Sequence, residues 1–145
     1  MEKRFKMGVV APKFSELLSA IDHYVAACGL PPAQIDLLKI RASQLNGCAY
    51  CIQSHTKEAR ARGETEKRIY ALDAWEESPY FTDDERTILA LTEEMTLIRD
   101  RRVSNATYQQ AIERFGEQAT AHLMMAMISI NAWNRIGIAT RMQPA

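Results

Sequence analysis

The most informative stretch of this 145-residue chain is Ser43–His55, SQLNGCAYCIQSH. It holds two cysteines, Cys48 and Cys51, three residues apart, and the imidazole of His55 follows four residues later. Positions separated by three, four and seven residues lie on one face of a helix, so the thiols and the imidazole are predicted to share a stripe. The turn-forming pair Asn46-Gly47 just before them predicts the break at which this helix begins.

The position of the thiols at the start of a helix predicts their chemistry. Asn46 or Gly47 is the expected N-cap, which places Cys48 and Cys51 in the first turn, where unpaired N–H groups and the helix dipole favour an anion. Such positions lower the pKa of a thiol from about 8.5 toward neutrality, and the thiolate is the reactive form. His55, one turn beyond Cys51, is placed to take its proton. Helix position alone favours Cys48 as the nucleophile and the imidazole favours Cys51, so both assignments stay open.

Composition narrows the class of protein. A length of 145 residues with 47% hydrophobic content predicts one domain, spanning 1–145, with a sizeable core. The 18 Lys and Arg residues balance the 18 Asp and Glu residues, which argues against a nucleic-acid partner. No run approaches the roughly 20 apolar residues of a membrane span and no signal peptide is recognisable, so we expect a cytoplasmic protein without a membrane partner. In that reducing compartment, a close pair among three cysteines indicates catalysis or metal binding rather than a structural disulfide framework.

Hydrophobic residues recur with a helical period throughout, and no stretch shows the alternation of a β-strand. The predicted fold is therefore all-α, a bundle of six to seven helices with the Cys-x-x-Cys pair at the N-terminus of a central one. Thr82 and Glu85 form the pattern of a capping box, Ser104 is a candidate N-cap and Gly116 a candidate helix stop. The expected helices cover about 14–28, 31–45, 48–62, 65–75, 82–97, 104–115 and 117–141.

A carboxylate partner for the imidazole follows from counting outward from the turn. Asp36 precedes Asn46 by ten residues and His55 follows it by nine, so in two antiparallel helices both lie about 14 Å from the turn. Asp36 is then predicted to face His55 and to fix its orientation as the third member of a nucleophile, base and orienter set. The alternative is that Asp36 is a solvated first-turn acid, and Glu58 is a weaker candidate for the same role.

For the other polar and reactive residues, we predict a structural role rather than a catalytic one. Cys28 closes an apolar stripe and is predicted to be a small buried side chain. His122 is predicted to be a hydrogen-bonded core histidine, and His23 to lie at the surface. The segment Trp133–Arg135 lies inside an apolar helix, where Asn and Arg need partners if they are buried. Helix or subunit packing is the expected role of that segment, with substrate binding second.

Several blocks along the chain match a known family. They are Leu38–Cys51 with His55, then Gly63-Glu64, Ala71–Trp75 and Ile130–Arg135. In this order they resemble the alkylhydroperoxidase D-like (AhpD-like) branch of the carboxymuconolactone decarboxylase superfamily. The resemblance implies an all-helical homo-oligomer, built from trimers or as a hexamer, that reduces hydroperoxides through a dithiol.

The resemblance also assigns roles by position. It makes Cys51 the peroxidatic thiol, His55 its proton-relay partner and Cys48 the resolving thiol that closes the Cys48–Cys51 disulfide. Asp36 stands twelve residues before the first cysteine, where the family usually has a relay glutamate one methylene longer. Tyr50 stands between the cysteines, where some peroxidatic members carry a second histidine.

The implied activity needs partners but no bound cofactor and no metal. Its substrate is a hydroperoxide, and an external dithiol, lipoyl-type or thioredoxin-like, resets the disulfide. The enzymatic alternative is a carboxymuconolactone decarboxylase-like lyase, which needs no cysteine pair. The non-enzymatic alternative is a redox-sensing or zinc-binding module, in which Cys48, Cys51 and His55 are joined by a fourth ligand such as Cys28, His23, His122 or a carboxylate.

Overall fold

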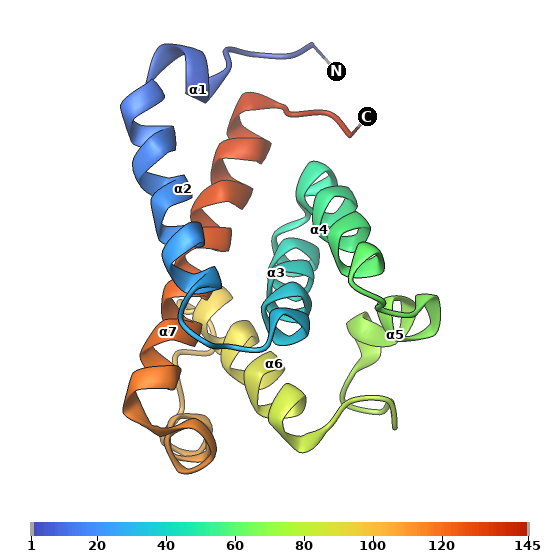
Figure 1. Cartoon of the computed structure of the whole chain (residues 1–145). Coiled ribbons are helices and arrows are strands. Elements are labelled where there is room, and N and C mark those ends of the chain that lie inside the picture. Colours follow the sequence, from blue (N-terminus) through green and yellow to red (C-terminus); the bar gives the residue numbers. More distant parts are fainter. Residues whose placement is uncertain (1, 145) are drawn as a thin grey trace.

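The computed structural model describes residues 2–144, and within them every regular element is helical (Figure 1). The elements are α1 (Met7–Val10), α2 (Pro12–Ala26), α3 (Pro32–Asn46), α4 (Ala49–Ala61), α5 (Glu66–Ala71), the short 3-10 helix η1 (Leu72–Ala74), α6 (Asp83–Thr96) and α7 (Asn105–Thr140). The all-α prediction of six to seven helices is confirmed. None of the helices in this described part is long and apolar enough to cross a membrane.

Helix α3 lies at the centre and packs against α4, α6 and α7 (Figure 1). Its two sides belong to different clusters of buried side chains. Leu38 and Ala42 join the larger cluster with α2, α6 and α7, whereas Leu37 and Ile40 join a smaller one with α4, η1 and α6. A helix buried on both sides is held from several directions, so the position of its C-terminal end, next to Cys48, is well fixed.

The predicted helix boundaries are mostly confirmed. Thr82 and Glu85 form the reciprocal capping box at the start of α6, and Ser104 accepts the N–H of Thr107 at the start of α7. Gly116 breaks the long α7 with a φ of 76°, close to where a new helix was expected. The helix expected over 65–75 is instead α5 followed by η1, because its last turn tightens into a 3-10 helix.

Some burial predictions are wrong. Cys28 is half-buried rather than buried, and its thiol donates to the carbonyl of Tyr24 at 3.0 Å. His122 is also half-buried, and its ring meets the edge of Tyr24 with centroids 5.7 Å apart. His23 is exposed as predicted.

A buried ionic network ties α3 to α6. The carboxylate of Glu93 is 4% exposed and accepts hydrogen bonds from Arg41 Nε at 2.9 Å and from the indole N–H of Trp75 at 2.8 Å. Its second oxygen accepts from Arg101 at 2.9 Å, and Arg41 also binds Asp73. Both buried charges are therefore paired, which is the condition under which such groups are tolerated.

We expect Glu93→Ala to destabilise the protein by about 3 kcal/mol, because the buried Arg41 then keeps only the exposed carboxylate of Asp73 as an ionic partner, together with the neutral side chain of Gln44. Urea unfolding measures the change in the free energy of unfolding. The matched control is Asp84→Asn, which breaks an exposed ion pair with Arg114 and is expected to cost less than about 1 kcal/mol. Equal losses in the two variants would contradict the assignment.

Candidate active site

The junction between α3 and α4 positions the two cysteines. Gly47 has a φ of 71°, a left-handed conformation that ends α3, and Cys48 follows in an extended conformation. The N-cap of α4 is Cys48 itself, because its sulfur accepts the backbone N–H of Cys51 at 3.4 Å. The expected cap at Asn46 or Gly47 is therefore wrong by one or two residues, although the cysteines do lie at the start of the helix.

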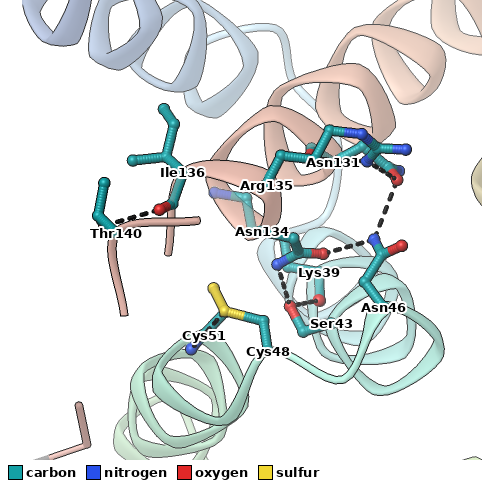
Figure 2. The surroundings of a disulfide bond; sticks show 10 residues. All are labelled: Lys39, Ser43, Asn46, Cys48, Cys51, Asn131, Asn134, Arg135, Ile136 and Thr140. Carbon is teal, nitrogen blue, oxygen red and sulfur yellow. Dashed lines mark hydrogen bonds between the residues drawn. A yellow bond between two sulfur atoms is a disulfide. The ribbon is translucent and has the colours of Figure 1, made fainter. Parts of the chain in front are cut away.

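Cys48 and Cys51 are joined by a disulfide, with their Cα atoms 5.3 Å apart. Figure 2 shows it between the start of α4 and the end of α7. Both residues are almost fully buried, at 2% and 5% exposed. The pair therefore has the proximity that a dithiol–disulfide couple requires.

Gly137 on α7 allows this close packing, and the sequence reasoning missed it. A Cβ atom at this position would lie 3.1 Å from the sulfur of Cys48 and 3.5 Å from that of Cys51. In the sequence, the only sign of this contact is that Gly137 is an isolated glycine inside an otherwise apolar helix. Such a glycine often has a packing reason. A side chain at position 137 would displace either the disulfide or the helix.

A network of amide and hydroxyl groups joins the end of α3 to α7 next to the disulfide (Figure 2). Asn134 is fully buried; its amide donates to Ser43 Oγ at 3.0 Å and its carbonyl accepts from Asn46 at 2.8 Å. Asn46 also donates to Asn131 at 3.0 Å. Asn134 thus has the partners that its burial requires, and they come from helix packing, as expected first for this segment.

The imidazole of His55 lies further along α4 with its side chain 15% exposed. Its Nδ1 is 3.0 Å from a carboxylate oxygen of Glu58, so Nδ1 carries the proton and Nε2 is left as an acceptor. Burial lowers the pKa of His55 from its ordinary value, and the nearby charge of Lys39 lowers it further, while Glu58 and Asp22 oppose these effects. The ring is therefore neutral near pH 7 and suited to accept a proton.

Asp36 is buried at 4% exposed, so the alternative of a solvated first-turn acid is wrong. Its Oδ1 accepts from Arg62 at 2.6 Å, and within residues 2–144 its buried Oδ2 has no hydrogen-bond partner. Burial raises the pKa of Asp36, while Arg62 and the charge of His55 act against the rise. The structure gives Glu58 rather than Asp36 the direct contact with the imidazole, although α3 and α4 pack together as the counting assumed.

A cavity of about 230 Å³ is lined by Cys51 and His55 together with Tyr50, Trp133, Asp22, Ser54 and Met142. The place of Asp22 in this cavity was not predicted from the sequence. Its carboxylate accepts from the indole N–H of Trp133 at 2.8 Å and lies 3.4 Å from Lys39 Nζ. It therefore orients an aromatic wall of the cavity, and no motif marks it because its partners come from α3 and α7.

Comparison with known proteins identifies the family. Residues 12–94, more than half of the chain, match the model of the Carboxymuconolactone decarboxylase family. The chain belongs to this family, and its fold and Cys-x-x-Cys pair place it in the AhpD-like branch.

The structure shows no group of three or more Cys, His, Asp or Glu side chains that would hold a metal ion in the described range.

Two relatives align along almost the whole chain. The uncharacterized protein YdfG of Bacillus subtilis (strain 168) is 38% identical over 139 residues, which are 96% of this chain and 95% of that protein. ATU0492 from Agrobacterium tumefaciens, a protein of unknown function provisionally named antioxidant defence protein AhpD, is 31% identical with a TM-score of 0.95 over 99% of both chains. The debrominase Bmp8 shares the fold at 16% identity, with a TM-score of 0.82 over 92% of this chain and 72% of that one.

We predict opposite effects on the pKa of His55 from its two charged neighbours. Glu58→Gln removes a nearby negative charge and is expected to lower the pKa further, whereas Lys39→Met removes a positive charge and is expected to raise it. Titration of the ring proton signals by NMR measures both, with His23 as an internal reference. A rise in Glu58→Gln would contradict the assignment.

The lowered pKa of His55 also determines the direction in which the stability of the fold changes with pH. The unfolded chain binds this proton more tightly than the folded protein, so the stability contributed by the neutral imidazole is present above pH 6.5 and is lost as the pH falls through 6.5 toward the folded pKa.

Gly137→Ala is expected to favour the reduced form, because free thiol side chains rotate away from the added methyl and the disulfide sulfurs do not. We expect the equilibrium constant for reduction by glutathione to rise about fivefold, equivalent to roughly 1 kcal/mol of overpacking. Gly8→Ala is the matched control, since its added Cβ makes only an ordinary 3.8 Å contact with Ser15. An unchanged equilibrium in Gly137→Ala would show that the helix yields instead.

Proposed function

We propose that this protein is a thiol-dependent peroxidase of the AhpD type, an antioxidant oxidoreductase that reduces hydroperoxides with Cys48 and Cys51. One observation carries the proposal: Cys51, which is paired with Cys48, lines the same cavity as the neutral imidazole of His55. A nucleophile and a base thus share one cavity, and the second thiol is bonded to the nucleophile. This is the set that a dithiol peroxidase requires.

The reaction begins when His55 takes the proton of the Cys51 thiol. The thiolate attacks the terminal-side oxygen of the hydroperoxide, the O–O bond breaks, and the alkoxide takes the proton from His55 and leaves as an alcohol. Cys51 is now a sulfenic acid. The thiol of Cys48 attacks its sulfur, water leaves, and the disulfide forms. The peroxide has been reduced by two electrons and the dithiol oxidised by two.

An external dithiol, lipoyl-type or thioredoxin-like, returns the protein to its reduced state. One thiolate attacks the disulfide, a mixed disulfide forms, and the second external thiol displaces the protein sulfur. We assign this cycle to the cytoplasm, as the sequence leads us to expect, and to a homo-oligomer built from trimers or as a hexamer, as the family resemblance implies.

Asp36 serves as a proton store for His55 in this proposal. Its carboxyl is buried, burial raises its pKa, and its Oδ2 has a free acceptor position within the described structure. Glu58 holds the ring in its tautomer, so two carboxylates divide the roles for which Asp36 was the first candidate and Glu58 the weaker one.

The proposal predicts the loss of two of the three thiols when reduced, metal-free protein meets one equivalent of cumene hydroperoxide. A free-thiol count over time measures it. Cys51→Ser is expected to abolish the reaction. Cys28→Ser is the matched control, because Cys28 lies outside the cavity, and it should lose both remaining thiols at the unchanged rate.

Other outcomes separate the alternatives. Persistence of all thiols at the Cys51→Ser rate would contradict the peroxidase, and a lactone decarboxylase activity that survives Cys51→Ser would establish the lyase. In the same assay, Asp36→Asn tests the proton store. It should slow thiol oxidation, and an unchanged rate would remove Asp36 from the mechanism.

A further inference from the structure

The cavity at Cys51 has a larger neighbour. A second cavity of about 450 Å³ shares three lining residues with it, Tyr50, Trp133 and Met142. Most of the rest of its wall comes from residues 3–9 and from the end of α7, and Figure 1 shows these two segments near each other at the top of the view. A ligand that fills both spaces reaches the reactive sulfur with one part and extends toward the termini with another.

The wall of the larger cavity is mostly apolar. Aromatic and aliphatic side chains dominate it, including Phe5, Met7, Val9, Trp133, Ile136 and Met142. A volume of this size lined in this way lies in the range of small-molecule sites, and it favours a ligand with a long apolar part. Hydrogen peroxide makes no use of such a wall.

All charged residues that line this cavity are basic. They are Lys3, Arg4, Lys6 and Arg141. In the described structure none of them forms an ion pair with a carboxylate, whereas Lys39 and Arg62 near the reactive centre both do. Arg4 is fixed by hydrogen bonds to the carbonyls of Ala139 and Thr140, so at least one cation is held at the rim. Unpaired cations around an apolar space complement an amphiphile with a negative end.

We infer that the two cavities together bind a fatty-acid hydroperoxide, with the peroxy group at Cys51, the hydrocarbon chain in the larger cavity and the carboxylate among the basic residues. This inference rests on the proposed peroxidase function and names its substrate class. The chemistry balances as above: the fatty-acid hydroperoxide becomes the hydroxy fatty acid, one water leaves, and the dithiol becomes the disulfide.

Binding is tested first with dodecanoate, which has the tail and the charge but no peroxide. Tryptophan fluorescence reports it, because Trp133 lines both cavities while Trp75 is buried in the other core cluster. We expect saturable binding that weakens with salt, and binding of dodecyltrimethylammonium, which has the same tail and the opposite charge, at least about tenfold weaker.

A pair of double variants measures how much the lysine charges at the cavity contribute to dodecanoate binding. Lys3→Gln/Lys6→Gln is expected to weaken dodecanoate binding by about tenfold. The matched control, Lys57→Gln/Lys67→Gln, makes the same change in net charge at exposed positions outside both cavities and should leave the affinity unchanged. Equal affinity for the two amphiphiles, or equal affinities in the two variants, would overturn the inference.

Turnover is tested with linoleic acid hydroperoxide and with tert-butyl hydroperoxide, which has no tail. The ratio of their rate constants for thiol oxidation should fall about tenfold in Lys3→Gln/Lys6→Gln and stay constant in the control. If dodecanoate binds as expected and neither hydroperoxide oxidises the thiols, the anionic amphiphile site stands and the peroxidase fails. If both oxidise the thiols and dodecanoate does not bind, the inference alone fails.

Two other occupants of the cavity have distinct signatures. Co-sedimentation with vesicles of phosphatidylglycerol and phosphatidylcholine, without dodecanoate binding, would assign the basic residues to a lipid surface. A subunit count that falls in Lys3→Gln/Lys6→Gln, again without dodecanoate binding, would assign the cavity to a second copy of the chain. Either result overturns the inference.

Discussion

The left-handed turn at Gly47 is the constraint on which the rest of the site depends. It ends α3 and starts α4 within two residues, so the last turn of one helix and the first turn of the other lie side by side. Asn46 before the turn binds α7, and Cys48 after it caps α4. Because α3 is buried on both sides, this turn is held in place, and the disulfide has a fixed position against α7 rather than one on a mobile loop.

Close approach of α7 closes the site from the other side. Gly137 lets the helix backbone lie against both sulfurs, and Asn134, one turn earlier, satisfies polar groups that the approach buries. Trp133 on the same helix faces the cavity and is oriented by Asp22 of α2. One helix therefore supplies packing, hydrogen bonding and a wall of the cavity together. Helix packing, the first role expected of this segment, is confirmed for Asn134, and substrate binding stays a prediction for Trp133.

Local patterns made the fold and the thiol pair predictable, and long-range contacts account for what was missed. Caps at Thr82 and Ser104 are set by residues within one turn, so they could be read directly. Asp22 has partners more than 100 residues away, at Ser129 and Trp133, and no local spacing reveals such contacts. The exchange of Glu58 for Asp36 at His55 has a different origin. Glu58 is a local neighbour of His55 on α4, and counting along two helices fixes the distance of Asp36 from the turn but not the direction of its side chain.

Opposite pKa shifts on the two facing helices support the assignment of proton transfer to this pair. Burial raises the pKa of Asp36 and lowers that of His55, so the two values, ordinarily more than two units apart, move toward each other. A smaller difference in pKa makes proton transfer between the two groups less one-sided, which suits the proposed relay, because it must accept a proton from a thiol and return it to an alkoxide. The charged neighbours oppose the shifts: Arg62 acts against the rise in the pKa of Asp36, and Glu58 acts against the fall in the pKa of His55. Burial therefore acts on both groups in the direction that narrows the difference between their pKa values, and the ion-pair partners act in the direction that widens it.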